Sequence, residues 1–147
     1  MAYDIQEHKH RFSAWAASRA ASVVNNRFKV NEGKSIIESA GIAKTIDELP
    51  EADLFDNYHE QLRNKVIVAS RRYGHEFTHG VAAKLINVYL KSIFVCTEEY
   101  DNSKVKAIHP PIDSVLLDTL YREDIGGQKE RWNITRKIKW SKLSDSD

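Results

Sequence analysis

The segment from Gly80 to Cys96 is apolar on almost every side when it is read as a helix. A helix of this kind needs neighbours around most of its circumference, because exposing its side chains to water costs free energy. We therefore expect this segment to be the central helix of the fold. Its apolar residues are Val81, Leu85, Ile86, Val88, Tyr89, Leu90, Ile93, Phe94 and Val95.

Three polar residues interrupt this helix. Lys84, Asn87 and Lys91 are separated by three and four positions, so a helix places them on one narrow stripe. We expect this stripe to be the one face that the helix leaves uncovered. Lys84 is then either a solvated lysine, as most helical lysines are, or an amine presented to a ligand.

Apolar spacings of three and four recur along the chain, whereas the alternation typical of strands is weak. The pattern predicts helices over about residues 4–23, 33–40, 50–73, 80–96 and 110–122. For a chain of 147 residues, this pattern indicates an all-α fold, a single compact helical domain of about five to six helices. In the first helix, the predicted apolar face contains Ile5, Phe12, Trp15, Ala16, Ala20 and Val23.

Composition restricts the class of protein. Charged residues make up 29% of the chain and hydrophobic residues 41%, which is typical of a folded globular protein. No apolar run reaches the roughly 18 residues that span a bilayer, and the N-terminus lacks the apolar region of a secretory signal. We therefore expect a cytoplasmic protein with no membrane partner. Its single cysteine, Cys96, is predicted to be a small core residue.

Positive charge is concentrated near the C-terminus, although the formal net charge is only +1. Residues 129–147 form a basic segment in which Arg136, Lys137 and Lys139 can contact phosphates while Trp132 and Trp140 stack on bases. The alternative is that both tryptophans close the core and the cations are solvated around them.

Two further cations, Arg71 and Arg72, end the predicted helix over residues 50–73. The helix dipole favours cations at this position without any ligand. Both arginines are also candidates for contact with a nucleic-acid phosphate.

The stretch from residue 80 to residue 88 reads Gly-Val-Ala-Ala-Lys-Leu-Ile-Asn-Val. It resembles the hairpin and following helix of the helix-hairpin-helix DNA glycosylases, the endonuclease III and 8-oxoguanine glycosylase superfamily, whose pattern is L-P-G-V-G-x-K-T-A-N-V. Ala82 replaces the second glycine of that pattern, and Thr78-His79 replace its Leu-Pro. The resemblance implies that Lys84 is a nucleophile. The coincident positions are Gly80, Val81, Lys84, Asn87 and Val88.

A second element of that family is a V-D-x-H segment at the start of the next helix. The residues from His109 to Ser114, His-Pro-Pro-Ile-Asp-Ser, are similar to it, and the resemblance then covers about residues 74–122. It implies that Asp113 is the catalytic carboxylate. Lys84 and Asp113 are 29 positions apart, which is farther than is usual in the family, so residues 97–107 are expected to be an inserted loop.

The chemistry implied by this pair is cleavage of an N-glycosidic bond. A carboxylate stabilises the positive charge that develops on the sugar, and an amine can attack the anomeric carbon to form a Schiff base. The resemblance also implies that backbone N–H groups of residues 80–83 hold a phosphate. We therefore expect a DNA-binding protein that resembles base-excision glycosylases and AP lyases and needs no cofactor. Its nucleic-acid contacts are predicted at Gly80, Val81, Ala82, Ala83, Asn87, Arg71, Arg72, Arg136, Lys137 and Lys139.

Several alternatives stay open. Asp113 stands at a predicted helix start, where capping alone favours aspartate, and Gly80 can belong to a helix capped by Thr78. The chain can be a non-catalytic helical module that binds nucleic acid or protein, such as a phage-defence or accessory protein. It can also form a homo-oligomer through its first helix. No metal site is predicted, because the spacing of His75, His79 and His109 fits no common ligand pattern.

Overall fold

A computed structural model describes residues 2–147 and shows a compact all-α protein, which confirms the predicted fold class. Seven α-helices lie in this range, against the five to six predicted, and the one β-type pairing within it is an isolated bridge between Val23 and Asn26. The helices are α1 (Ile5–Ala21), α2 (Val30–Ala40), α3 (Phe55–Ser70), α4 (His79–Leu90), α5 (Ser103–Lys106), α6 (Ser114–Arg122) and α7 (Lys129–Lys137). Short turns of other helix types are η1 (Ile46–Glu48), η2 (Ala52–Leu54), η3 (Arg71–Tyr73), η4 (Lys91–Val95), η5 (Ile125–Gly127) and η6 (Trp140–Lys142).

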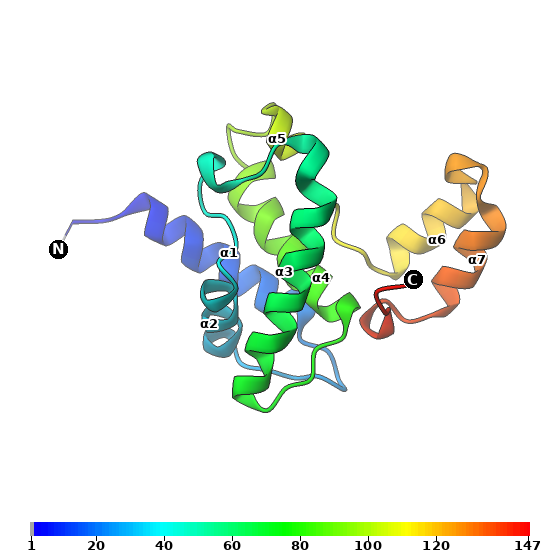
Figure 1. Cartoon of the computed structure of the whole chain (residues 1–147), viewed down its shortest axis with the longest axis horizontal. Coiled ribbons are helices and arrows are strands. Elements are labelled where there is room, and N and C mark those ends of the chain that lie inside the picture. Colours follow the sequence, from blue (N-terminus) through cyan, green and yellow to red (C-terminus); the bar gives the residue numbers. More distant parts are fainter. Residues whose placement is uncertain (1) are drawn as a thin grey trace.

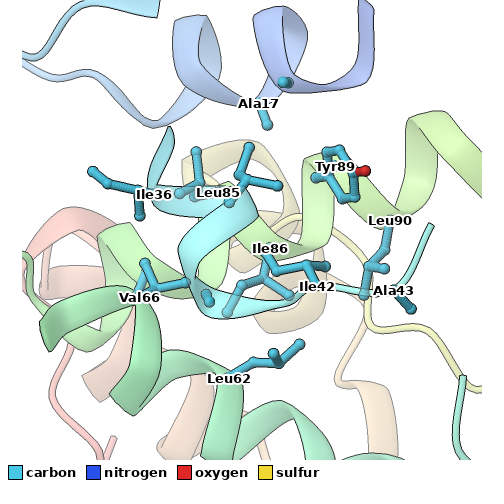
Figure 2. Packing of buried hydrophobic residues seen from close by; sticks show 14 of the residues in the cluster. Ala17, Ile36, Ile42, Ala43, Leu62, Val66, Leu85, Ile86, Tyr89 and Leu90 are labelled. Carbon is cyan, nitrogen blue, oxygen red and sulfur yellow. The ribbon is translucent and has the colours of Figure 1, made fainter. Parts of the chain in front are cut away.

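Helix α4 is central, as its composition predicts. It packs against α1 on one side and α3 on another, while α2 contacts both α1 and α3 (Figure 1). Figure 2 shows Leu85, Ile86 and Leu90 of α4 among the buried side chains of the neighbouring elements, Leu62 and Val66 of α3 included. The helix continues into η4, a π-helical turn in which Ile93 and Phe94 are also buried.

The face that α1 turns to the core differs from the predicted one. Ala14, Ala17 and Ala21 are fully buried, whereas Phe12 and Trp15 are at least half exposed. The prediction followed hydrophobicity, but the distance between packed helices depends on the size of the side chains at the contact. The alanine face lets α1 approach α2 and α4 closely, so the large apolar residues are left on the outside.

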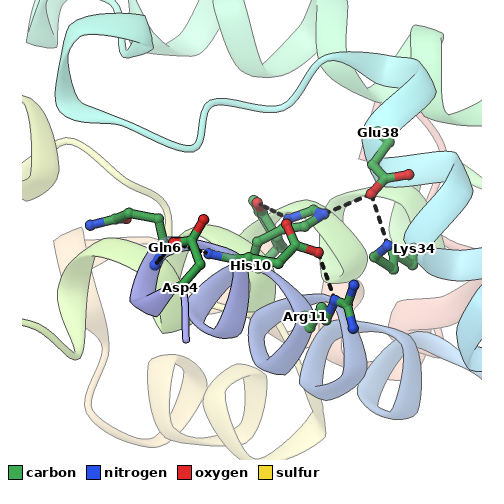
Figure 3. Close-up of polar contacts among 8 residues, drawn as sticks. Asp4, Gln6, His10, Arg11, Lys34 and Glu38 are labelled. Carbon is green, nitrogen blue, oxygen red and sulfur yellow. Dashed lines mark hydrogen bonds and ion pairs between the residues drawn. The ribbon is translucent and has the colours of Figure 1, made fainter. Parts of the chain in front are cut away.

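A buried polar contact joins α1 to its two neighbours. The Tyr89 hydroxyl donates to Nδ1 of His10 (2.8 Å), and Nε2 of His10 donates to the Glu38 carboxylate (2.8 Å), as drawn in Figure 3. Burial raises the pKa of Tyr89, so the phenol keeps its proton and acts as the donor. The hydrogen bond from His10 holds the pKa of Glu38 below its usual value. These contacts fix the position of α1 against both α4 and α2.

Helices α6 and α7 form a pair beside the α1–α4 body (Figure 1). Gly126 and Gly127 form the turn between them with φ values of +71° and +64°, a region that glycine adopts without steric cost. Residues 109–113 lead from the body to α6 without helical structure, and residues 138–147 return to the first turn of α4. Both connections therefore cross the space between the body and the helical pair.

Cys96 is exposed, so its prediction as a core residue is wrong. It follows the π-helical turn, whose last residue, Val95, is already exposed. Over residues 2–147, no helix has both the length and the apolar character that a bilayer span requires.

The packing of α1 predicts losses of different size for two substitutions that are two positions apart, with the greater loss at Ala17. Ala17→Leu adds volume to a fully buried position and should lower the free energy of unfolding by about 1–3 kcal/mol. Trp15→Ala removes a half-exposed side chain and should cost clearly less than removal of a buried tryptophan, which costs about 3–5 kcal/mol. Urea denaturation followed by circular dichroism measures both. A greater loss in Trp15→Ala than in Ala17→Leu would contradict this packing.

Candidate functional site

Lys84 and Asp113 lie together in the structure. The Lys84 amine donates a hydrogen bond to the Ile112 carbonyl oxygen (3.1 Å) and lies 3.5 Å from Oδ2 of Asp113. It also lies over the ring of Trp140, 5.2 Å from the ring centroid. A carbonyl, a carboxylate and an aromatic face therefore surround one amine, and the pair implied by the resemblance is close in space.

The polar stripe of α4 is covered, contrary to prediction. Lys84 is only 8% exposed and Asn87 is buried, so Lys91 alone remains at the surface. The Asn87 side-chain amide donates to the Pro110 carbonyl oxygen (3.2 Å), as Lys84 does to that of Ile112. Residues 109–112 are not helical, and the carbonyl groups of Pro110 and Ile112 take donors from α4 instead. The stripe thus binds the extended segment that leads to α6.

Asp113 is the N-cap of α6. Its Oδ1 accepts a hydrogen bond from the Leu116 N–H (2.9 Å), which satisfies one of the free donors at the helix start. This hydrogen bond and the nearby Lys84 charge hold the pKa of Asp113 below its usual value, although partial burial opposes them. The carboxylate is therefore ionised at neutral pH, and the same side chain both caps α6 and faces an ammonium group.

Residues 80–83 form the first turn of α4 and not a hairpin. Thr78 caps the helix by accepting from the Val81 N–H (3.1 Å), and the Gly80 N–H donates to the Leu143 carbonyl oxygen (3.0 Å). These contacts correct the prediction of a phosphate-binding hairpin, because the donors are used within the chain. Gly80 is needed for another reason: a Cβ atom there would overlap the Trp140 carbonyl oxygen.

A cleft of about 340 Å³ separates α3 and α4 from the α6–α7 pair. Leu116, Leu120 and Trp132 give one side an apolar surface, and the opposite side carries His59 and Asn87. Neither Lys84 nor Asp113 lines this cleft. Ile112 does line it, and the Ile112 carbonyl binds Lys84, so the pair lies next to the cleft at this residue.

A buried histidine, which the sequence did not lead us to expect, lies in the same region. Nε2 of His59 donates to Oδ1 of Asn87 (2.8 Å), and Nδ1 accepts from Nη1 of Arg63 (2.8 Å). Burial lowers the pKa of His59 to about 4, and the charge of His109, whose ring centroid is 4.7 Å away, acts in the same direction. The imidazole is therefore neutral at neutral pH. The available sequence signal was the four-residue spacing of His59 and Arg63 on one helix face.

The remaining predicted cations do not gather at the cleft. Arg71 pairs with Glu76 (3.0 Å), and Arg72 is exposed at the end of α3. Arg136 pairs with Asp118 (3.2 Å) and lies over the Tyr121 ring, while Lys137 and Lys139 are exposed. Their predicted contacts with nucleic acid stay predictions.

The two tryptophans of the basic segment differ in position. Trp140 packs against the core, as the structural alternative expects. Trp132 lines the cleft, and its indole N–H donates to the Ile125 carbonyl oxygen (2.7 Å). Only Trp132 therefore offers an aromatic surface to a ligand in the cleft.

The three histidines considered for a metal lie in separate contacts. His75 is 3.3 Å from Glu32, His79 accepts a hydrogen bond from Arg63, and His109 is 2.8 Å from Asp56.

Comparison with family models, with curated proteins and with solved structures gives no match. The interpretation of the site therefore depends on its own geometry and chemistry.

The packing at Gly80 predicts the effect of a single added methyl group. Gly80→Ala should lower the free energy of unfolding by about 1–3 kcal/mol, because the Cβ atom and the backbone of residue 140 cannot occupy the same space. Thermal or urea denaturation measures the change. Helix propensity alone would give the opposite sign, since alanine favours a helix over glycine, so a stabilised variant would contradict the contact with Trp140.

The low pKa of His59 predicts a loss of stability in mild acid. Between pH 6.5 and about 4, the unfolded imidazole binds a proton while the folded one does not, so stability falls as pH falls. The contribution of His59 to the free energy of unfolding is complete above pH 6.5. It decreases by up to about 1.4 kcal/mol per pH unit between pH 6.5 and about 4. An NMR titration, with His59→Gln to assign the signal, should give a pKa near 4. A midpoint near 6.5 would contradict the burial.

Proposed function

We propose that this chain binds DNA and cleaves the N-glycosidic bond of a base that has left the helix stack. Lys84 is the nucleophile, and Asp113 is the carboxylate that stabilises positive charge on the sugar. The observation that supports the proposal is the 3.5 Å distance between the Lys84 amine and the Asp113 carboxylate, which come from α4 and from the start of α6.

The proposed reaction uses both groups. The Lys84 ammonium first loses a proton to water, while Asp113, whose pKa is held below its usual value, stays ionised. The free amine attacks C1′ of the sugar, the bond from C1′ to the base breaks, and the base leaves with the electron pair and takes up a proton. Opening of the sugar ring then gives a Schiff base on Lys84. A negative carboxylate beside C1′ lowers the energy of the cationic transition state.

The adjacent cleft suits the group that has to leave. Its volume of about 340 Å³ and its apolar side suit a planar heterocycle. Lys84 is covered by residues 109–113, so this segment has to shift before C1′ can reach the amine. Helix α4 holds the segment by hydrogen bonds from Lys84 and Asn87 and by the Lys84–Asp113 ion pair, and His109 at its start contacts Asp56.

A second candidate function is a non-catalytic module that binds nucleic acid or protein. The favouring observation is that Lys84 and Asn87 already have a structural task, since they fasten residues 109–113 to α4. If Lys84 serves only to hold this segment, its amine needs no catalytic role. In this case the cleft, or the exposed Phe12 and Trp15 on α1, is the binding surface.

Trapping with borohydride tests the enzymatic proposal. The wild-type chain should form a covalent adduct with DNA that carries an abasic site, because reduction fixes the Schiff base on Lys84. Lys84→Gln should give no adduct, whereas Asp113→Asn should still give one on this substrate, because no base has to leave. Lys91→Gln is the matched control, because Lys91 is an exposed lysine of the same stripe and its loss should leave the rate unchanged.

The other outcomes separate the rival functions. DNA binding that weakens with salt but gives no adduct supports the binding module and rejects the nucleophile. Absence of both adduct and DNA binding, in a variant set that circular dichroism shows to be folded, rejects the DNA proposal and leaves a protein partner or self-association.

A further inference from the structure

Arg63 is held in one orientation at the edge of the cleft. Its Nη1 donates to Nδ1 of His59 (2.8 Å), and its Nε donates to Nδ1 of His79 (3.3 Å). His59 is fixed in turn by its hydrogen bond to Asn87 of α4. An imidazole nitrogen that accepts a hydrogen bond carries no proton, so both contacts orient the guanidinium without neutralising its charge.

The third nitrogen of this guanidinium binds a carboxylate. Nη2 donates to Oδ1 of Asp145 (2.7 Å), and Nδ1 of His79 lies 3.7 Å from the same oxygen. Within residues 2–147, Asp145 provides the one carboxylate that lies within 4 Å of Arg63. The Arg63 side chain is 19% exposed and that of Asp145 is 53% exposed. An oriented, largely covered cation is therefore paired with an anion from a surface segment.

Asp147 is the other carboxylate that lines the cleft, and it is engaged elsewhere. Its Oδ2 accepts hydrogen bonds from the Ser144 N–H (2.8 Å) and from the Ser144 hydroxyl (2.7 Å). The positive charge of Arg63 is thus balanced at short range by Asp145 alone.

We infer that Arg63, which His59 and His79 orient, is an anion subsite of the cleft that takes a phosphate group, and that the Asp145 carboxylate occupies it when no phosphate is bound. A guanidinium presents paired N–H groups that fit the oxygens of phosphate as well as those of carboxylate. The Asp145 carboxylate is half exposed and lies near the end of the chain, so a phosphate can displace it from Arg63 without moving a helix.

The position of the subsite indicates how a ligand is oriented. Arg63 and the apolar residues Leu116 and Trp132 line the same cleft. A nucleotide that places its phosphate on Arg63 can therefore direct its base against the apolar side. The identification of the ligand as a nucleotide rests on the proposed function, whereas the anion subsite itself follows from the contacts of Arg63.

Phosphate binding in matched variants tests this inference. The probes are inorganic phosphate, a nucleoside 5′-monophosphate and a short single-stranded oligonucleotide, with affinity measured by calorimetry at low salt. Asp145→Asn removes the competing charge and should bind the probes about tenfold more tightly than the wild type, as expected for loss of one weak ion pair. Arg63→Gln should abolish this binding. Arg122→Gln, which removes an exposed guanidinium that pairs with Glu123 and does not line the cleft, should leave it unchanged.

The probes also distinguish the sources of the phosphate. Equal tightening for inorganic phosphate and the nucleotide supports a subsite for phosphate alone, and greater tightening for the nucleotide supports binding of the base in the cleft. Unchanged affinity of Asp145→Asn for all three probes would overturn the inference. Because this variant changes an exposed residue, the test can be carried out even if Arg63→Gln does not fold. If borohydride trapping fails but Asp145→Asn still binds the probes more tightly than the wild type, only the glycosidic chemistry is rejected.

Discussion

The need to cover α4 on all sides determines most of this structure. A helix with apolar residues around its circumference is stable in water only inside a shell of other elements, and α1, α3 and residues 140–143 provide that shell. The polar stripe is part of the same problem. Once Lys84 and Asn87 are enclosed, their donors need acceptors, because an unpaired buried polar group is costly. The carbonyl oxygens of Ile112 and Pro110 meet this need.

This requirement links the fold to the candidate chemistry. The Ile112 carbonyl that accepts from Lys84 immediately precedes Asp113, so the hydrogen bond that closes α4 also brings a carboxylate to the amine. Asp113 is held independently by its role as the N-cap of α6. The two charged groups thus meet through backbone contacts that serve folding.

The sequence predicts the elements better than their contacts. The all-α class and the central position of α4 follow from apolar spacing, and the proximity of Lys84 and Asp113 agrees with the motif resemblance. The buried face of α1 was predicted wrongly, because hydrophobicity favours Trp15 while close helix packing favours alanine. The cover over Lys84 could not be predicted, because residues 109–113 have no periodic pattern that shows where they lie.

The contacts of Gly80 and Arg63 were missed for a related reason. Both involve residues 140–145, which come to α4 and α3 from a distant part of the sequence. A glycine that permits close approach of another segment reads in the sequence like a glycine that forms a hairpin. Only the position of Trp140 distinguishes the two.

The return of residues 140–143 to the start of α4 has a consequence for synthesis of the protein. Leu143 is translated 63 residues after Gly80, although its carbonyl oxygen accepts the hydrogen bond from the Gly80 N–H. On the ribosome, α4 therefore emerges long before this part of its shell, and an apolar helix stays open on one side of the nascent chain. Such surfaces bind chaperones or each other, so the yield of folded protein should depend on how quickly translation delivers the last turn.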